Sequence, residues 1–340
     1  MAHPALETPP KLTIGITEAC PLHCRHCYAD CAPSPKSGEL SSRQWITLIN
    51  DLAAQGVIQV YFEGGEPLVK PGFVEILSTA ASCMMTLLRT HGCGLSATMA
   101  QSLSVAGLGR ALVDIMGPDA ATHDAATGVA GSFVQACAAV RHLTSAGIPT
   151  DVLVVLTRDA APRLNAIARL ARDLGAERLG ILRLYPLGRA RQCWEEIALG
   201  LSEQMQALAT LSPPDGLTIM QSWHPNDHNC CWQAAAINAF GRAIGCMYLR
   251  EYVDFGDATK IRYNEIFRSH PLYRQLRSGN VEEHCESCSA SQGTGGGCRS
   301  TAFAWYGRWT APDPFDSALN HDVDLTRLPP ERPHAGVLGA

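Results

Sequence analysis

Short apolar, β-prone runs alternate with helical patterns from residue 11 to residue 184, and this alternation constrains the fold more than any other feature. The helical patterns between the runs are clearest at residues 132–146 and 162–174. Strands that alternate with helices are typical of a parallel sheet. The sequence therefore predicts an α/β fold, either an open doubly wound sheet or a partial barrel, with ligands at the carboxyl ends of the strands. The six β-prone runs lie at residues 11–17, 57–62, 86–89, 111–115, 151–156 and 179–184.

The alternation stops near residue 215, after a loop-rich stretch at residues 211–216. Glycine, cysteine and polar residues become more frequent beyond it, so we expect a second, smaller domain. The expected organisation is an N-terminal tail (1–10), a β/α domain (11–215), a cysteine-rich C-terminal domain (216–320) and a loose C-terminal tail (321–340).

The composition excludes several classes of protein. The formal net charge of −5 and the lack of a lysine- or arginine-rich run argue against binding to nucleic acid or to a membrane surface. No apolar run reaches the roughly 18 residues that a membrane-spanning helix needs, and the N-terminus lacks the parts of a signal peptide. We therefore expect a cytoplasmic protein. Because disulfides are improbable in a reducing compartment, the 14 cysteines point to metal binding or catalysis.

Three cysteines follow the first β-prone run, with three residues between Cys20 and Cys24 and two between Cys24 and Cys27. Thiolates are the usual protein ligands of iron–sulfur clusters. Three ligands leave one iron open, and a metal centre that binds substrate needs such an open position. The alternative is a zinc site, which His23, His26 or Cys31 would complete.

The spacing Cys-x₃-Cys-x₂-Cys behind an opening strand resembles the signature of the radical S-adenosylmethionine (SAM) enzymes. The resemblance implies a partial (β/α)6 barrel of parallel strands. It also implies that Cys20, Cys24 and Cys27 ligate a [4Fe–4S] cluster whose open iron is chelated by SAM. The family usually has an aromatic residue before the third cysteine, where this chain has His26. Cys31 lies outside the motif and is expected to be a bystander.

The second β-prone run ends in a glycine-rich motif, Gly64-Gly65-Glu66-Pro67. Two glycines let a ligand approach the backbone closely. Taken alone, the motif is also compatible with an ordinary turn. Placed after the second strand, it resembles the family's motif for the SAM amino group, so the resemblance makes these four residues candidate cofactor-binding residues.

Two further segments resemble the family. Asp114 begins a segment, residues 114–128, that is similar to the region of the fourth strand, and it is a candidate to bind the SAM ribose or a substrate. A polar strand end whose carboxylate is satisfied by the protein is the alternative. Arg183 lies where the family has an arginine at the end of the sixth strand, and a guanidinium there could pair bidentately with the SAM carboxylate. A surface salt bridge is the alternative.

The C-terminal cysteines are spaced like those of the SPASM extension of radical SAM enzymes, which carries auxiliary iron–sulfur clusters. A zinc ribbon is the alternative. The expected ligands are Cys231, Cys246, Cys285, Cys288 and Cys298.

The number of auxiliary clusters follows from departures from the SPASM pattern. Thr294 and Asp316 stand where cysteines are usual in that extension. Two complete four-thiolate clusters need eight cysteines, and this region has six if Cys230 is included. We therefore expect one auxiliary cluster, as in the shortened relatives called twitch domains, with spacing alone unable to choose its four ligands.

The resemblance implies that the enzyme reductively cleaves SAM to a 5′-deoxyadenosyl radical, which abstracts a hydrogen atom from the substrate. It also implies an electron donor such as flavodoxin or ferredoxin. The favoured substrate is a peptide or peptide-like precursor of a natural product. Because the first strand begins near residue 11, a separate peptide-recognition protein is expected. The alternatives are radical modification of a small molecule, such as a sugar, nucleoside or tetrapyrrole, and a zinc-dependent binding or scaffold protein.

Overall fold

Eight strands, all paired in parallel, form one sheet in the order β7-β6-β5-β4-β3-β2-β1-β8. The computed structural model describes residues 6–221, 230–278, 281–282, 297–316, 320 and 322–333. The strands are β1 (Lys11–Gly15), β2 (Gln59–Glu63), β3 (Met85–Thr90), β4 (Arg110–Asp114), β5 (Thr150–Val155), β6 (Arg178–Leu182), β7 (Thr218–Gln221) and β8 (Ala236–Ile237).

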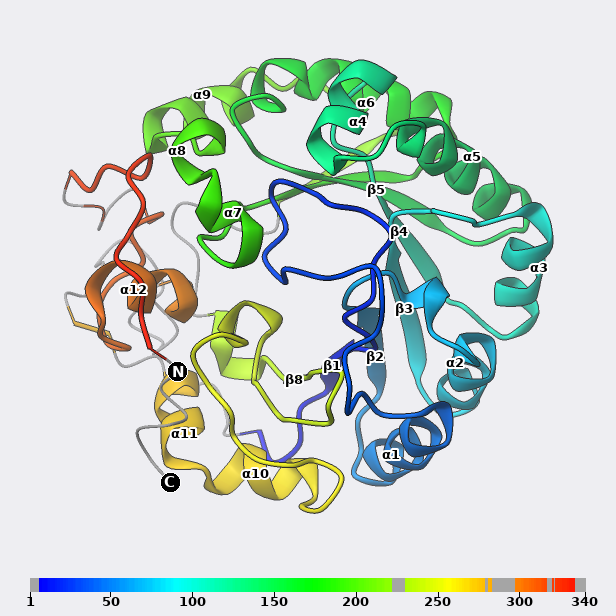
Figure 1. Cartoon of the computed structure of the whole chain (residues 1–340), viewed down its shortest axis with the longest axis vertical. Coiled ribbons are helices and arrows are strands. Elements are labelled where there is room, and N and C mark those ends of the chain that lie inside the picture. The colour runs from blue at the N-terminus through cyan, green and yellow to red at the C-terminus, as the bar shows by residue number, and fades with distance from the viewer. Residues whose placement is uncertain are drawn as a thin grey trace.

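The sheet curls into a partial barrel with helices on its outside (Figure 1). Strands β1 to β7 lie in sequence order, so the sheet has no point at which the order reverses, as a doubly wound sheet requires. The partial barrel is thus the correct alternative. The helices of this region are α1 (Ser42–Ala54), α2 (Phe73–Ala81), α3 (Ala97–Val105), α4 (Ala120–Thr127), α5 (Ser132–Ser145), α6 (Leu164–Asp173), α7 (Gly188–Gln192), α8 (Trp194–Ile197) and α9 (Leu201–Ala209).

All six predicted strands are confirmed, and the sheet gains β7 and β8 at its edges. Both added strands follow residue 215, so the sheet continues into the region assigned to the smaller domain; the domain division itself stays a prediction. Strands of four and two residues are too short to show a periodic pattern, which is why the sequence did not reveal them.

Local chemistry explains the helix boundaries. The Ser41 side chain accepts a hydrogen bond from the backbone N–H of Gln44, whose side chain bonds back to Ser41, so α1 begins with a capping box. Helix α2 begins at Phe73, because the preceding residue, Gly72, has a left-handed backbone conformation (φ of 73°) that is incompatible with an α-helix. On α5, Cys137 is buried in the hydrophobic core.

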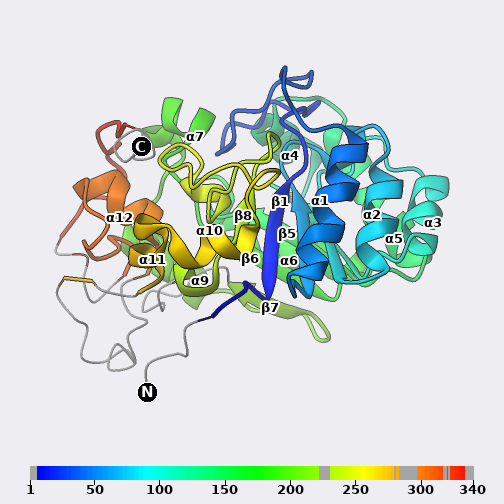
Figure 2. The same cartoon turned by 90° about the horizontal axis from the view of Figure 1, so that it is seen from below.

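The chain after β8 forms α10 (Tyr263–Ser269), α11 (Pro271–Arg277) and α12 (Arg299–Tyr306). Figure 2 shows these helices on one side of β1, with α1, α2 and α3 on the other. None of the described helices has the length and apolar character needed to cross a bilayer.

Three neighbouring strands are tied together by one carboxylate at their amino ends. Asp151 of β5 is completely buried and lies 2.8 Å from Nη1 of Arg110 on β4. Its other oxygen lies 2.8 Å from Nη2 of Arg178 on β6. The two arginines would each be left without this partner if the carboxylate were removed.

We therefore predict that Asp151→Ala lowers the free energy of unfolding by about 3–5 kcal/mol, the range for breaking a buried ion pair from one side. Denaturant unfolding of the apoprotein measures it. The matched control is Asp173→Ala, an exposed carboxylate on α6, which should change stability by less than about 0.5 kcal/mol. Equal stability of the two variants would contradict the prediction.

Candidate active site

A cavity lies at the carboxyl ends of the strands, with about 700 Å³ of empty space that is partly open to solvent. The loop that follows β1, drawn in blue in Figure 1, crosses the centre of the ring of helices and forms one wall of this cavity. The structure therefore brings residues from distant parts of the chain to the place that the α/β pattern indicated. The sequence-derived candidates that line the cavity are Cys20, Cys24, Cys27, Gly64, Gly65, Asp114 and Arg183.

The thiols of the blue loop interact electrostatically. Burial, followed by the charges of Cys27 and Cys20, raises the pKa of the Cys24 thiol well above its usual value. In contrast, a hydrogen bond from Cys31 lowers the pKa of Cys27 well below its usual value. Cys31, expected to be a bystander, is therefore a buried neighbour of a candidate ligand.

This donor set suits an iron–sulfur cluster. Three crowded thiolates repel one another, and cationic iron removes that repulsion. A cubane cluster spreads its thiolate ligands over several irons, which suits three neighbouring cysteines on one loop.

The glycine motif after β2 is held against the start of the cysteine loop by backbone hydrogen bonds. The Gly65 N–H donates to the Thr17 carbonyl at 2.8 Å, and the Glu66 N–H donates to the Ala19 carbonyl at 2.8 Å. A Cβ on Gly65 would lie 2.0 Å from the Ala19 oxygen. Glycine is therefore needed here for the approach of two backbone segments, a role that the sequence did not indicate.

Glu66 lies behind the cavity wall. Its fully buried carboxylate accepts hydrogen bonds from the Thr90 hydroxyl at 2.8 Å and from the His91 N–H at 2.7 Å. Burial raises its pKa. Pro67 opens a short 3₁₀ turn, Pro67–Val69, and is also buried. These two residues fix the motif to the end of β3, and direct contact of either with SAM stays a prediction.

Asp114, at the end of β4, is held by Arg89 of β3. Nε of Arg89 lies 3.0 Å from one carboxylate oxygen and Nη2 lies 3.0 Å from the other. His91 Nδ1 lies 3.3 Å from the same carboxylate. Although burial opposes its charged form, a hydrogen bond to Cys20 and the charge of Asp114 raise the pKa of His91 to about 9. Asp114 is thus a satisfied strand end that still faces the cavity.

Arg183 forms a buried ion pair rather than one at the surface. Its Nη1 lies 2.7 Å from Oδ2 of Asp313, and both side chains are 2% exposed. The same carboxylate oxygen accepts the backbone N–H of Cys298 at 2.8 Å. The pair therefore joins the end of β6 to the C-terminal cysteine region, and a role of Arg183 in binding SAM stays a prediction.

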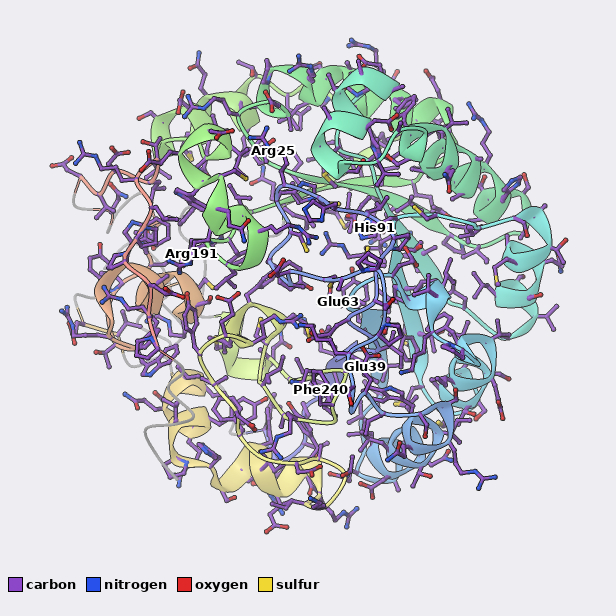
Figure 3. All side chains as sticks on the ribbon, viewed as in Figure 1. Arg25, Glu39, Glu63, His91, Arg191 and Phe240 are labelled. Atoms are coloured by element: carbon purple, nitrogen blue, oxygen red, sulfur yellow. The ribbon has the colours of Figure 1, made fainter. Side chains whose placement is uncertain are left out.

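The structure adds cavity residues that the sequence interpretation missed. Glu63, the last residue of β2, is directed into the interior together with His91 (Figure 3). The Tyr28 hydroxyl donates to Glu63 at 3.1 Å, and burial raises the pKa of that carboxyl. The Tyr248 ring stacks on Tyr185 with centroids 3.7 Å apart. Polar residues at the ends of the second and third strands were the signal available in the sequence.

The C-terminal cysteines are only partly described. Cys231 and Cys298 are buried, and Cys246 is partly buried. Burial and then the charge of Cys298 raise the pKa of Cys246 to about 12. Asp316 is buried three residues after Asp313. The remaining residues that the sequence singled out here, Cys230 as a side chain, Cys285, Cys288 and Thr294, lie outside the described residues.

Comparison with family models accounts for both cysteine regions. The Radical SAM superfamily model matches residues 14–171, and the model of the SPASM iron–sulfur cluster-binding domain matches residues 230–289. The two matched regions together span more than half of the chain and contain the first cysteine motif and four of the candidate auxiliary ligands.

Two relatives are similar to this protein over most of its length. The chain is 28% identical to the PqqA peptide cyclase of Gluconobacter oxydans over 92% of both chains. It is 28% identical to the AdoMet-dependent heme synthase of Oleidesulfovibrio alaskensis over 88% of this chain and 85% of that relative.

Solved structures support the fold. Streptococcus suis SuiB bound to S-adenosylmethionine aligns with a TM-score of 0.74 and 14% identity, over 92% of this chain and 78% of SuiB. SuiB bound to its precursor peptide SuiA aligns with a TM-score of 0.72 and 13% identity, over 93% of this chain and 76% of SuiB.

The close backbone approach at Gly65 gives a prediction. A methyl group at this position forces Ala19, and with it the adjacent Cys20, to move. We expect Gly65→Ala to bind SAM at least about tenfold more weakly and to lose iron from the first motif, measured by calorimetry and iron assay. Gly200→Ala is the control, because a Cβ there meets its nearest atom at 3.4 Å. Normal SAM binding and iron content in Gly65→Ala would contradict the role of this contact.

Proposed function

This chain belongs to the radical SAM superfamily and carries a C-terminal SPASM domain, and we propose that it modifies a peptide or peptide-like precursor of a natural product. The observation that carries the proposal is the full-length similarity to a peptide cyclase, which includes the C-terminal cysteine region. The fold shared with SuiB, a protein solved with its precursor peptide, is consistent with it. The cavity at the strand ends is where a peptide residue would meet SAM.

In this proposal, the cysteines of the first motif and the glycine motif have separate roles. Cys20, Cys24 and Cys27 hold a [4Fe–4S] cluster, and Gly64 and Gly65 form the SAM-binding wall, which Glu66 and Pro67 support from behind. When bound, the reduced cluster and SAM supply a 5′-deoxyadenosyl radical that abstracts a hydrogen atom from the substrate. The protein's own contribution is to orient the reactants and to exclude water from a largely buried cavity.

The polar residues of the cavity serve to position ligands. The bidentate pair of Arg89 with Asp114 fixes the ends of β3 and β4. The Glu63 carboxylate, oriented by the Tyr28 hydroxyl, is available to accept a hydrogen bond from the substrate. The aromatic faces of Tyr185 and Tyr248 line the cavity beside it and exclude water. Asp114 and Arg183 stay candidates for SAM binding.

The C-terminal domain is proposed to hold one auxiliary iron–sulfur cluster. The family match implies auxiliary clusters. The ligands are drawn from Cys231, Cys246, Cys285, Cys288 and Cys298, with Asp316 standing where a further thiolate is usual. Carboxylate oxygen is a poorer ligand than thiolate for iron–sulfur chemistry, which favours a single cluster.

Replacing Cys20, Cys24 and Cys27 with alanine should abolish formation of 5′-deoxyadenosine from SAM under dithionite, because no cluster then has an open iron. The iron and sulfide that remain should equal one cluster, and further replacement of Cys231 and Cys246 should remove them. Cys83→Ala, an exposed thiol, is the control and should retain full activity. SAM cleavage by the triple variant would contradict the assignment of the first motif as the SAM-cleaving cluster. Remaining iron equal to two clusters would contradict the single auxiliary cluster.

Two partners complete the proposal. A low-potential electron donor, flavodoxin or ferredoxin, reduces the cluster, and a separate peptide-recognition protein presents the precursor. We place the reaction in the cytoplasm.

A second candidate function rests on the similarity to a heme synthase. At 28% identity over 88% of this chain, that relative is as similar as the peptide cyclase. A tetrapyrrole is therefore the alternative substrate class, and oxidation of its side chain would use the same cluster and the same cavity.

The two classes are separated by one experiment. Reconstituted protein is incubated anaerobically with SAM and dithionite, and either synthetic peptides from short reading frames beside its gene or a tetrapyrrole is added. We expect peptide-dependent 5′-deoxyadenosine and a mass change in the peptide, both absent from the Cys20/Cys24/Cys27 triple variant. A mass change in the tetrapyrrole alone would refute the peptide proposal and establish the alternative.

A further inference from the structure

Arg189 lies where the barrel meets the cysteine loop. It is the second residue of α7, which follows β6 and lies beside the blue loop in Figure 1. Although charged, Arg189 is only 8% exposed. Its Nε donates to the Cys24 carbonyl at 3.2 Å, and its Nη1 donates to the Cys31 carbonyl at 2.9 Å. One side chain therefore bridges two points of the loop that are seven residues apart.

The backbone of α7 strengthens this bridge. The Ala190 N–H donates to the Cys27 carbonyl at 3.3 Å. A Cβ on Gly188 would lie 2.7 Å from the same carbonyl oxygen, so glycine is needed for α7 to come this close. The carbonyls of Cys24, Cys27 and Cys31 thus all accept hydrogen bonds from two consecutive residues of one short helix.

In the part of the chain that the structure describes, the charge of Arg189 has no buried carboxylate partner. Among the described residues, its one ion-pair partner is Asp30, at 3.3 Å, whose side chain is 57% exposed. A buried cation is costly unless an opposite charge compensates it. Arg189 lines the same cavity as Cys20, Cys24 and Cys27. The thiolates of the loop are therefore the buried negative charge that it faces.

We propose that Arg189 is a positioning residue that latches the cysteine loop around the cluster and supplies the counter-charge of its thiolates. Arginine suits both tasks, because its planar guanidinium directs several N–H groups at fixed angles and stays protonated when buried. Lysine at this position would keep the charge but could not bridge the Cys24 and Cys31 carbonyls with the same geometry. The inference concerns the cluster site and does not depend on the substrate class.

The first test measures how firmly the cluster is held. Reconstituted holoprotein is mixed anaerobically with an iron chelator, and the iron of the first motif is the fraction that the Cys20/Cys24/Cys27 triple variant lacks. We expect this fraction to be released at least about tenfold faster from Arg189→Met, since two charge-assisted hydrogen bonds are lost. Arg189→Lys should release it at an intermediate rate.

Arg191→Met is the matched control, because this arginine of the same helix donates to the Pro329 carbonyl instead of the loop. Its release rate should equal that of the unmodified protein. A wild-type rate in Arg189→Met, or equally fast release from Arg191→Met, would overturn the latch. If Arg189→Met does not fold, a wild-type rate in Arg189→Lys would overturn it as well.

The second test addresses the charge. The midpoint potential of the cluster whose electron paramagnetic resonance signal changes on SAM addition is measured in each variant. Loss of a buried cation disfavours the reduced, more negative cluster. We expect a more negative potential in Arg189→Met and a nearly unchanged one in Arg189→Lys. An unchanged potential in Arg189→Met would overturn the counter-charge role. Neither test contains a substrate, so a failed peptide proposal would leave both results interpretable.

Discussion

The contact on which the site depends is the backbone approach between the glycine motif after β2 and the beginning of the cysteine loop after β1. Gly65 and Glu66 donate hydrogen bonds to the carbonyls of Thr17 and Ala19, one on each side of Glu18. The parallel pairing of β1 with β2 brings both loops to the same edge of the sheet. Because Cys20 directly follows Ala19, the first thiol and the glycine motif proposed to bind SAM are fixed by the same few atoms.

A second constraint is the way in which charge is buried around the cavity. Asp114 is neutralised bidentately by Arg89, and Asp313 is neutralised by Arg183. Each pair joins segments that come from different strands or domains, so the electrostatic pairing also fixes the geometry of the walls. Arg189 differs, because within the described chain its carboxylate partner is largely exposed and its main contacts are with the cysteine loop.

The sequence predicted those parts of the molecule that are encoded locally. The six long strands and the helices α5 and α6 follow from hydrophobic periodicity. The cavity location follows from parallel strands that are consecutive in the sheet. The two-residue strand β8 and the pairing of Arg183 with Asp313, 130 residues apart, could not be predicted, since neither leaves a local pattern. Glu63 and Arg89 are intermediate cases: their positions at the ends of apolar runs are visible in the sequence, but their contacts are not.

The segment after Cys246 has a consequence for how the protein is made. Arg250 pairs with Glu18 at the start of the cysteine loop, and the Glu251 carboxylate accepts the N–H of Gly188 at the start of α7. Supports for the first motif thus come from residues that a ribosome adds more than 200 positions later. A nascent chain that has exposed its three cysteines therefore still lacks these contacts, which can form only after the C-terminal region has been synthesised.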